Sequence, residues 1–140
     1  HSSDGKANLH QGAVGVGIDM GSGQSVCAVQ HNRIVSQHPD TQIRFDQLII
    51  PHWQQLLELA SSCAGMAGLD YLGVDIVLDR LRGPMLLELN ARPGLAIQVA
   101  NQSGLEHRLL LAAEIADDCQ DAEQKIRLAR QHFSSLPKQP

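Results

Sequence analysis

The sequence has few aromatic residues and no block of basic ones. Aromatic side chains make up 3% of its 140 residues, and 11 Lys and Arg stand against 15 Asp and Glu, which gives a formal net charge of -4. Nucleic-acid binding relies on clustered cations and on aromatic side chains that stack on bases. The composition therefore argues against a nucleic-acid partner, although a few local cations can still hold a small anionic ligand.

Cysteine pairs and long apolar runs are also missing. Cys27, Cys63 and Cys119 are widely spaced and odd in number, and no CxxC pair occurs, so neither a disulfide framework nor a zinc ribbon is indicated. No apolar run approaches the ~20 residues that a membrane-spanning helix needs, and no signal peptide is visible. We therefore expect a cytoplasmic protein without a membrane partner, in which the cysteines are core residues.

The residues that are present suit a single domain with its own core, because 43% of them are hydrophobic. Alternating apolar positions predict three short strands, over residues 12–18, 24–31 and 33–38, with a turn at 20–23 between the first two. Two more strands are predicted at 71–79 and 84–90, joined by a four-residue loop with the sequence RLRG.

Apolar residues spaced three and four apart predict helices elsewhere. One helix covers Trp53 to Ala64, with Pro51 in its first turn and Gly65 or Gly68 at its end. Two others are predicted over 105–116 and 122–133. The order of strands, helix, hairpin and helices indicates the α+β class, with a mostly antiparallel sheet and flanking helices.

The second hairpin brings two acids and an amide to one face. With a four-residue loop, Asp79 pairs with Pro84, Asp75 lies opposite Glu88, and Asn90 follows two residues later on the same face. Opposed carboxylates repel each other unless a cation lies between them. Mg²⁺ accepts two carboxylates and an amide oxygen and completes its shell with water and phosphates. The alternative is an ordinary solvated surface.

Two other polar stretches are candidates for ligand contacts. Arg92 follows Asn90 in a rigid Arg-Pro-Gly turn that can aim a guanidinium at a phosphate or carboxylate. Lys6, Asn8 and His10 alternate near the start of the chain, so an extended backbone would point them the same way; a polar surface loop is the alternative. Neither a Walker A loop nor a Rossmann fingerprint is present.

Two stretches of the chain resemble the ATP-grasp ligases, specifically the α-L-glutamate ligase (RimK-type) branch. GVDIVLDRLRGPMLLELNARPGL, from Gly73 to Leu95, is similar to the closing segment of that family, and KANLHQGA, from Lys6 to Ala13, is similar to its other nucleotide-contacting stretch. Both occur in the family's order with an apolar helix between them. This joint match is more specific than either stretch alone.

The resemblance implies that residues 1–116 form the C-terminal subdomain of an ATP-grasp fold, without the lid and the preceding domain, and that 117–140 form a helix and a tail. It implies Mg²⁺, or Mn²⁺ as the alternative ion, on Asp75, Glu88 and Asn90, and Arg92 and Lys6 as catalytic residues. It also implies ATP contacts from the N-terminal stretch, by Lys6, Ala7, Asn8 and His10.

The implied activity is ATP-dependent joining of a carboxylate to an amine through an acyl phosphate, on small-molecule or peptide substrates. Lys6 stands where that family has an arginine and Arg92 where it has a smaller residue, so the acceptor can differ. We expect the chain alone to be inactive and to self-associate through exposed apolar surface. The alternatives are a non-catalytic nucleotide-binding or interaction module of the same fold, and an unrelated α+β domain that binds Ca²⁺.

Overall fold

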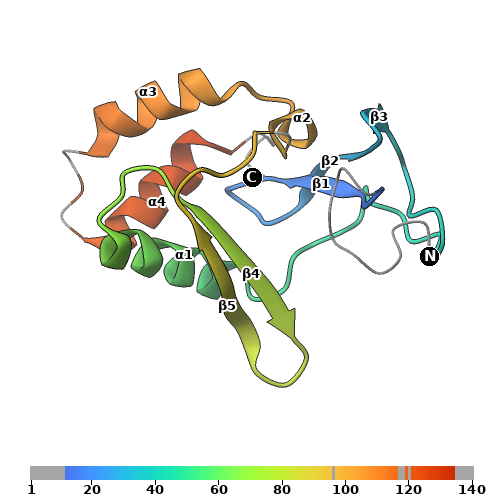
Figure 1. The fold of residues 1–140 in the computed structure, drawn as a ribbon, viewed down its shortest axis with the longest axis horizontal. Helices are drawn as coiled ribbons and strands as arrows, with labels where there is room; N and C mark the ends of the chain where they lie inside the picture. Colours follow the sequence, from blue (N-terminus) through green and yellow to red (C-terminus); the bar gives the residue numbers. More distant parts are fainter. Residues whose placement is uncertain (1–11, 96, 117–118, 120, 135–140) are drawn as a thin grey trace.

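The computed structural model describes residues 12–95, 97–116, 119 and 121–134. Within them the chain is α+β, as predicted, with two small antiparallel sheets and four helices. The β4–β5 ribbon runs beside α1, while α2 lies against β1 and β2 (Figure 1). The elements, in chain order, are β1 (Gly15–Ile18), β2 (Ser25–Gln30), β3 (Arg33–Ile34), α1 (Trp53–Ala67), β4 (Gly73–Asp79), β5 (Gly83–Asn90), α2 (Ile97–Asn101), α3 (Leu105–Ala116) and α4 (Ala122–His132).

The first sheet has the strand order β1-β2-β3, as the alternating pattern predicted. Gly17 pairs with Cys27 but Ile18 pairs with Ser25, so Val26 is an extra residue that forms a bulge in β2. The third strand is shorter than predicted and covers only Arg33–Ile34. It stops there because Gln37 turns to pair with Arg44 in a side loop instead of continuing along β2.

Helix α2 was not predicted, and it packs on the first sheet. Ala100 of α2 is fully buried, and its carbonyl oxygen would lie 2.2 Å from a Cβ placed on Gly17. No side chain therefore fits at Gly17 while α2 keeps this position. A five-residue helix contains too few turns to show an apolar period in the sequence, and this contact between distant segments is what holds it.

Helix α1 begins at Trp53, so Pro51 lies before the helix and not in its first turn as predicted. His52 has a left-handed backbone conformation, with φ of 57°, which separates Pro51 from the helix. The Trp53 indole N–H donates to the carbonyl oxygen of Met20 at 3.0 Å, so the helix start is attached to the turn between β1 and β2. The helix ends at Gly68, the second of the two predicted positions.

The same turn is organised by a buried carboxylate. Asp19 is 1% exposed and accepts hydrogen bonds from the backbone N–H and the hydroxyl of Ser22, both at 2.7 Å. Ser134, which follows α4, donates to the other Asp19 oxygen at 3.0 Å. Arg130 of α4 adds two hydrogen bonds to the carbonyl of Gly21, at 2.7 and 2.9 Å. The end of the described chain is thereby fixed to the first hairpin.

The predicted helix over 122–133 corresponds to α4, whose first turn is capped by the carboxylate of Asp121, which accepts from the backbone N–H of Gln124 at 2.7 Å. Its one buried residue is Ile126. The three cysteines are unpaired thiols. Cys63 is fully buried, as expected of a core residue, whereas Cys27 and Cys119 are only half-buried. No helix in the part of the chain that the structure describes is long and apolar enough to span a bilayer.

The β4–β5 hairpin carries much exposed apolar surface. Leu81 at its tip and Leu87 on β5 are 96% and 69% exposed. A two-stranded ribbon is marginally stable alone, and here α1 packs against both strands. The expected self-association through such surface stays a prediction.

The tip of this hairpin should open at acid pH. The Asp79 carboxylate accepts from the backbone N–H groups of Leu81 and Arg82, both at 2.9 Å, and these bonds lower the Asp79 pKa below its ordinary value of 3.8. This contribution to stability is complete above the unfolded-state pKa and is lost as pH falls through the folded-state pKa. NMR amide shifts of Leu81 and Arg82 should therefore move together below about pH 4, and Asp79→Asn, which keeps the acceptor oxygen, should remove that transition. A transition unchanged in the variant would contradict this assignment.

Candidate functional site

The predicted pairing of Asp75 with Glu88 is confirmed, although by a different route. The loop has three residues, 80–82, because Asp79 pairs with Gly83 and not with Pro84. Leu87 is then an extra residue, since Asp75 pairs with Glu88 but Ile76 pairs with Leu86. The shorter loop and the β-bulge offset each other, so the register at the far end of the hairpin is the predicted one.

Asn90 lies on the same face as these two carboxylates. It pairs with Gly73, two residues before Asp75 on β4, and residues two apart on a strand share a face. Its side-chain oxygen accepts from the backbone N–H of Arg92 at 2.9 Å. The amide oxygen is thereby oriented, and it keeps a second lone pair that can bind a cation.

The turn after β5 is held against β4 by close packing. A Cβ on Gly73 would lie 2.8 Å from the Cβ of Pro93 and 3.4 Å from that of Asn90. Glycine at this position therefore lets Pro93 approach the first residue of β4. The contact places the Arg92 backbone beside Asn90, while the Arg92 residue itself is exposed.

The electrostatics of the hairpin face suit a cation. Asp75 and Glu88 are exposed, and neither carboxylate has a hydrogen-bond or ion-pair partner in the described part of the chain. Two opposed negative charges without such a partner destabilise a hairpin. The described residues hold no group of three or more His, Cys, Asp and Glu positioned for a metal. Two carboxylates and an amide oxygen are ligands of the kind that Mg²⁺ accepts, since Mg²⁺ completes its shell with water and phosphates.

The roles of the remaining predicted site residues are not tested by the described structure. Lys6, Ala7, Asn8 and His10 lie outside the described residues, so their ATP contacts stay predictions. The Arg92 side chain makes no hydrogen bond or ion pair among the described residues. Its predicted role toward a phosphate or carboxylate stays a prediction as well.

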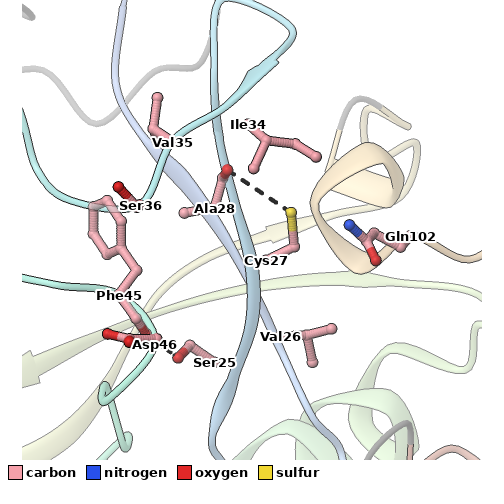
Figure 2. Close-up of a pocket in the computed structure, with 10 residues that line it drawn as sticks. All are labelled: Ser25, Val26, Cys27, Ala28, Ile34, Val35, Ser36, Phe45, Asp46 and Gln102. Carbon is pink, nitrogen blue, oxygen red and sulfur yellow. Dashed lines mark hydrogen bonds between the residues drawn. The ribbon is translucent and has the colours of Figure 1, made fainter.

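A cavity that sequence reasoning missed lies beside β2. It has a volume of about 270 Å³, and in Figure 2 Cys27, Ile34 and Gln102 lie on one side of the strand, with Ser36 and Phe45 on the other. Alternating strand residues indicate which positions are apolar, but not where β3 turns away from β2 and leaves this space. None of the predicted site residues lines it.

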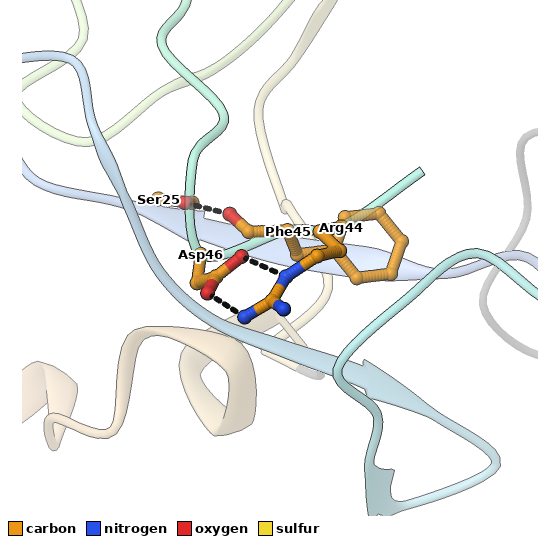
Figure 3. Close-up of polar contacts among 4 residues, drawn as sticks. All are labelled: Ser25, Arg44, Phe45 and Asp46. Carbon is orange, nitrogen blue, oxygen red and sulfur yellow. Dashed lines mark hydrogen bonds and ion pairs between the residues drawn. The ribbon is translucent and has the colours of Figure 1, made fainter. Parts of the chain in front are cut away.

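One ion pair lies at the edge of this cavity. Arg44 donates to both carboxylate oxygens of Asp46, through Nε at 3.0 Å and through Nη2 (Figure 3). The hydrogen bond from Arg44 lowers the Asp46 pKa, and the same bond raises the pKa of Arg44. Phe45 lies between Arg44 and Asp46 in the sequence, and its carbonyl accepts a hydrogen bond from the hydroxyl of Ser25. The hydrogen bond from Ser25 holds the 44–46 segment against β2.

Comparison with known proteins gives one result. A family model described as sugar-transfer associated ATP-grasp matches residues 1–114. The matched region includes Asp75, Glu88 and Asn90 and stops before α4. No match was found among curated proteins or among solved structures.

Proposed function

Because the chain belongs to the sugar-transfer associated ATP-grasp family, we propose that it forms the Mg·ATP-binding part of a carboxylate–amine ligase. The observation that carries the proposal is the direct pairing of Asp75 with Glu88, two carboxylates without a partner in the described structure. An ATP-dependent ligase requires a divalent cation beside the phosphates, and this face offers the oxygen ligands for it.

Each residue of the face has a defined part in this proposal. Asp75 and Glu88 supply anionic oxygens, and Asn90 supplies a neutral oxygen whose direction is set by the Arg92 N–H. Mg²⁺, or Mn²⁺ in its place, neutralises charge on the ATP phosphates when bound. The guanidinium of Arg92 orients a substrate carboxylate or phosphate, because its planar fork matches either group.

The proposed reaction has two steps. An oxygen of the substrate carboxylate attacks the γ-phosphorus of ATP, which forms an acyl phosphate and releases ADP. The amine nitrogen then attacks the acyl carbon, the C–O bond to phosphate breaks, and the amine proton passes to solvent. The protein accelerates both steps by positioning the reactants and by stabilising charge, which requires fixed cations and hydrogen-bond donors. Lys6, Ala7, Asn8 and His10 are proposed to contact the nucleotide, and Lys6 also to face the reacting phosphate.

The motif resemblance and the family match point to different acceptor amines. The motifs resemble the glutamate-ligase branch, whereas the matched family is described by its association with sugar transfer. Amino acids, peptides and amino sugars are therefore the amines to compare. The cytoplasmic location, predicted from the cysteines, stays a prediction.

The proposal is tested first by binding. Calorimetry with ATP should show binding in Mg²⁺ that is lost in EDTA, and Asp75→Asn should weaken it at least tenfold because a charged ligand is removed. Asp70→Asn is a matched control, because Asp70 is an exposed carboxylate before β4 that makes no hydrogen bond or ion pair in the described structure. If both variants lose the same ATP affinity, or if ATP binding does not depend on Mg²⁺, the site is rejected.

Turnover is then measured on the longest natural chain that contains these residues. Release of ADP and phosphate that depends on one amine of the panel supports the ligase. Mg²⁺-dependent ATP binding without turnover across the whole panel favours the non-catalytic module instead. Binding of Ca²⁺ without any affinity for ATP would favour an unrelated cation-binding domain.

A further inference from the structure

A second cavity, with a polar lining, lies between α3 and α4, and neither Asp75 nor Glu88 lines it. Its volume is about 130 Å³, and its lining includes His107 and Arg108 of α3 together with His132, Phe133 and Ser134 at the end of α4. Every titratable side chain that lines it in the described structure is an arginine or a histidine. We propose that this cavity binds an oxyanion, the phosphate or carboxylate group of a ligand.

Arg108 is the residue best prepared for this role. Its guanidinium carbon lies 5.2 Å from the centre of the Phe133 ring, a cation–π contact that fixes the group over the ring face. The contact uses the face of the guanidinium and leaves its N–H edge able to donate two parallel hydrogen bonds. No carboxylate forms an ion pair with Arg108 in the described part of the chain.

The two histidines add donors to the same cavity. Both are exposed, so their rings can turn an N–H toward a ligand, in the neutral or the protonated form. A cavity with an arginine and no carboxylate in its described lining stands out in a chain with a formal net charge of -4. Two features lower the affinity of the cavity for an anion. The C-terminus of α4 carries partial negative charge, and the hydroxyl of Ser134 already donates to the buried carboxylate of Asp19.

Size and position define the ligand class. A cavity of about 130 Å³ holds a single phosphate or carboxylate group and is too small for a whole nucleotide. His132, Phe133 and Ser134 lie beyond residues 1–114, the part that the family model matches. The inference therefore does not depend on the Mg·ATP site, and either can fail without the other.

The test is a titration of the full chain with inorganic phosphate and, separately, with acetate, at constant ionic strength. Backbone amide NMR shifts of residues 107–108 and 132–134 should change with a midpoint in the millimolar range. Arg108→Gln should raise that midpoint at least tenfold, because a charge-assisted bidentate contact is lost. Arg80→Gln removes the same charge from the β4–β5 loop and should leave it unchanged. The anion that binds more tightly identifies the ligand as phosphate or carboxylate.

Three outcomes would overturn the proposal. These are no shift with either anion, equal midpoints in the wild type and Arg108→Gln, or equal weakening in Arg80→Gln, which would mean general charge screening. If Arg108→Gln is unfolded, the same titration is carried out on the double variant in which the exposed His107 and His132 are both replaced by glutamine. The midpoint should then rise several-fold, and an unchanged midpoint would reject the site.

Discussion

Replacing Glu88 by glutamine should stabilise the metal-free protein and, in the same variant, remove most of its Mg²⁺-dependent ATP binding. The stabilising part follows from the pairing of Glu88 with Asp75, because like charges directly opposite each other destabilise a hairpin. The expected gain is about 0.2–1 kcal/mol in the free energy of unfolding, within the range of such cross-strand pairs.

The loss of binding should be much larger than this gain. Removing even an indirect partner of a metal ligand typically costs ten- to a hundred-fold in metal affinity, so removing a direct carboxylate ligand should cost at least about a hundred-fold. A substitution that raises the free energy of unfolding and lowers the ATP affinity identifies a residue whose role is to bind the ligand. A glutamate that only packs or only solvates the surface would change both properties little, or both in the same direction.

Stability and ATP affinity are both measured on Glu88→Gln and on a control variant. Urea unfolding in EDTA gives the stability, and calorimetry with ATP and Mg²⁺ gives the affinity. Glu114→Gln is the control, since Glu114 is an exposed carboxylate on α3 and makes no hydrogen bond or ion pair in the described structure. If Glu88→Gln loses stability in EDTA and keeps its ATP affinity, the carboxylate pair is a solvated surface and not a metal site.

The carboxylate pair was predictable because its two residues sit on one hairpin. Only a loop length and an alternating pattern were needed to place Asp75 opposite Glu88, and a wrong loop length was offset by the bulge at Leu87. Bulges are hard to read from sequence, since no residue type requires one. The register at Glu88 was therefore right for a reason that the pattern alone did not contain.

Other features that sequence reasoning missed join distant parts of the chain. The buried Asp19 meets Ser134 across 115 positions, and the cavity between α3 and α4 exists only once Arg108 reaches Phe133. The spacing of apolar residues indicates which face of a helix or strand is apolar, but it does not indicate which other element that face contacts. Such contacts are visible only in the folded chain.

Gly17→Ala should lower the free energy of unfolding by about 2–3 kcal/mol, the upper range for overpacking a tight contact. The added methyl would lie 2.2 Å from the carbonyl oxygen of Ala100 and 2.6 Å from its carbonyl carbon. Backbone atoms of a packed helix cannot move aside as a flexible side chain can, so α2 must shift as a unit. Urea unfolding of the variant measures the loss.

Gly65→Ala is the matched control for this substitution. A Cβ on Gly65 would meet nothing within 4 Å, and Gly65 lies inside α1, where alanine is favoured over glycine by up to about 1 kcal/mol. The same chemical change should therefore stabilise at one position and destabilise at the other. A Gly17 variant as stable as wild type would show that α2 does not lie on β1 in this way.

The Gly17 substitution should also reach the candidate site. The segment between Asn90 and Ile97 connects β5 to α2. It includes Arg92, whose N–H orients Asn90, and Pro93, which packs on Gly73. A shift of α2 pulls on that short connection, so Mg²⁺-dependent ATP affinity should fall in Gly17→Ala under conditions where the variant is still folded. Gly65→Ala should leave the affinity unchanged, because a Cβ at Gly65 meets nothing within 4 Å and therefore displaces neither β4 nor β5. Full affinity in a folded Gly17 variant would mean that the position of α2 and the metal face are independent of each other.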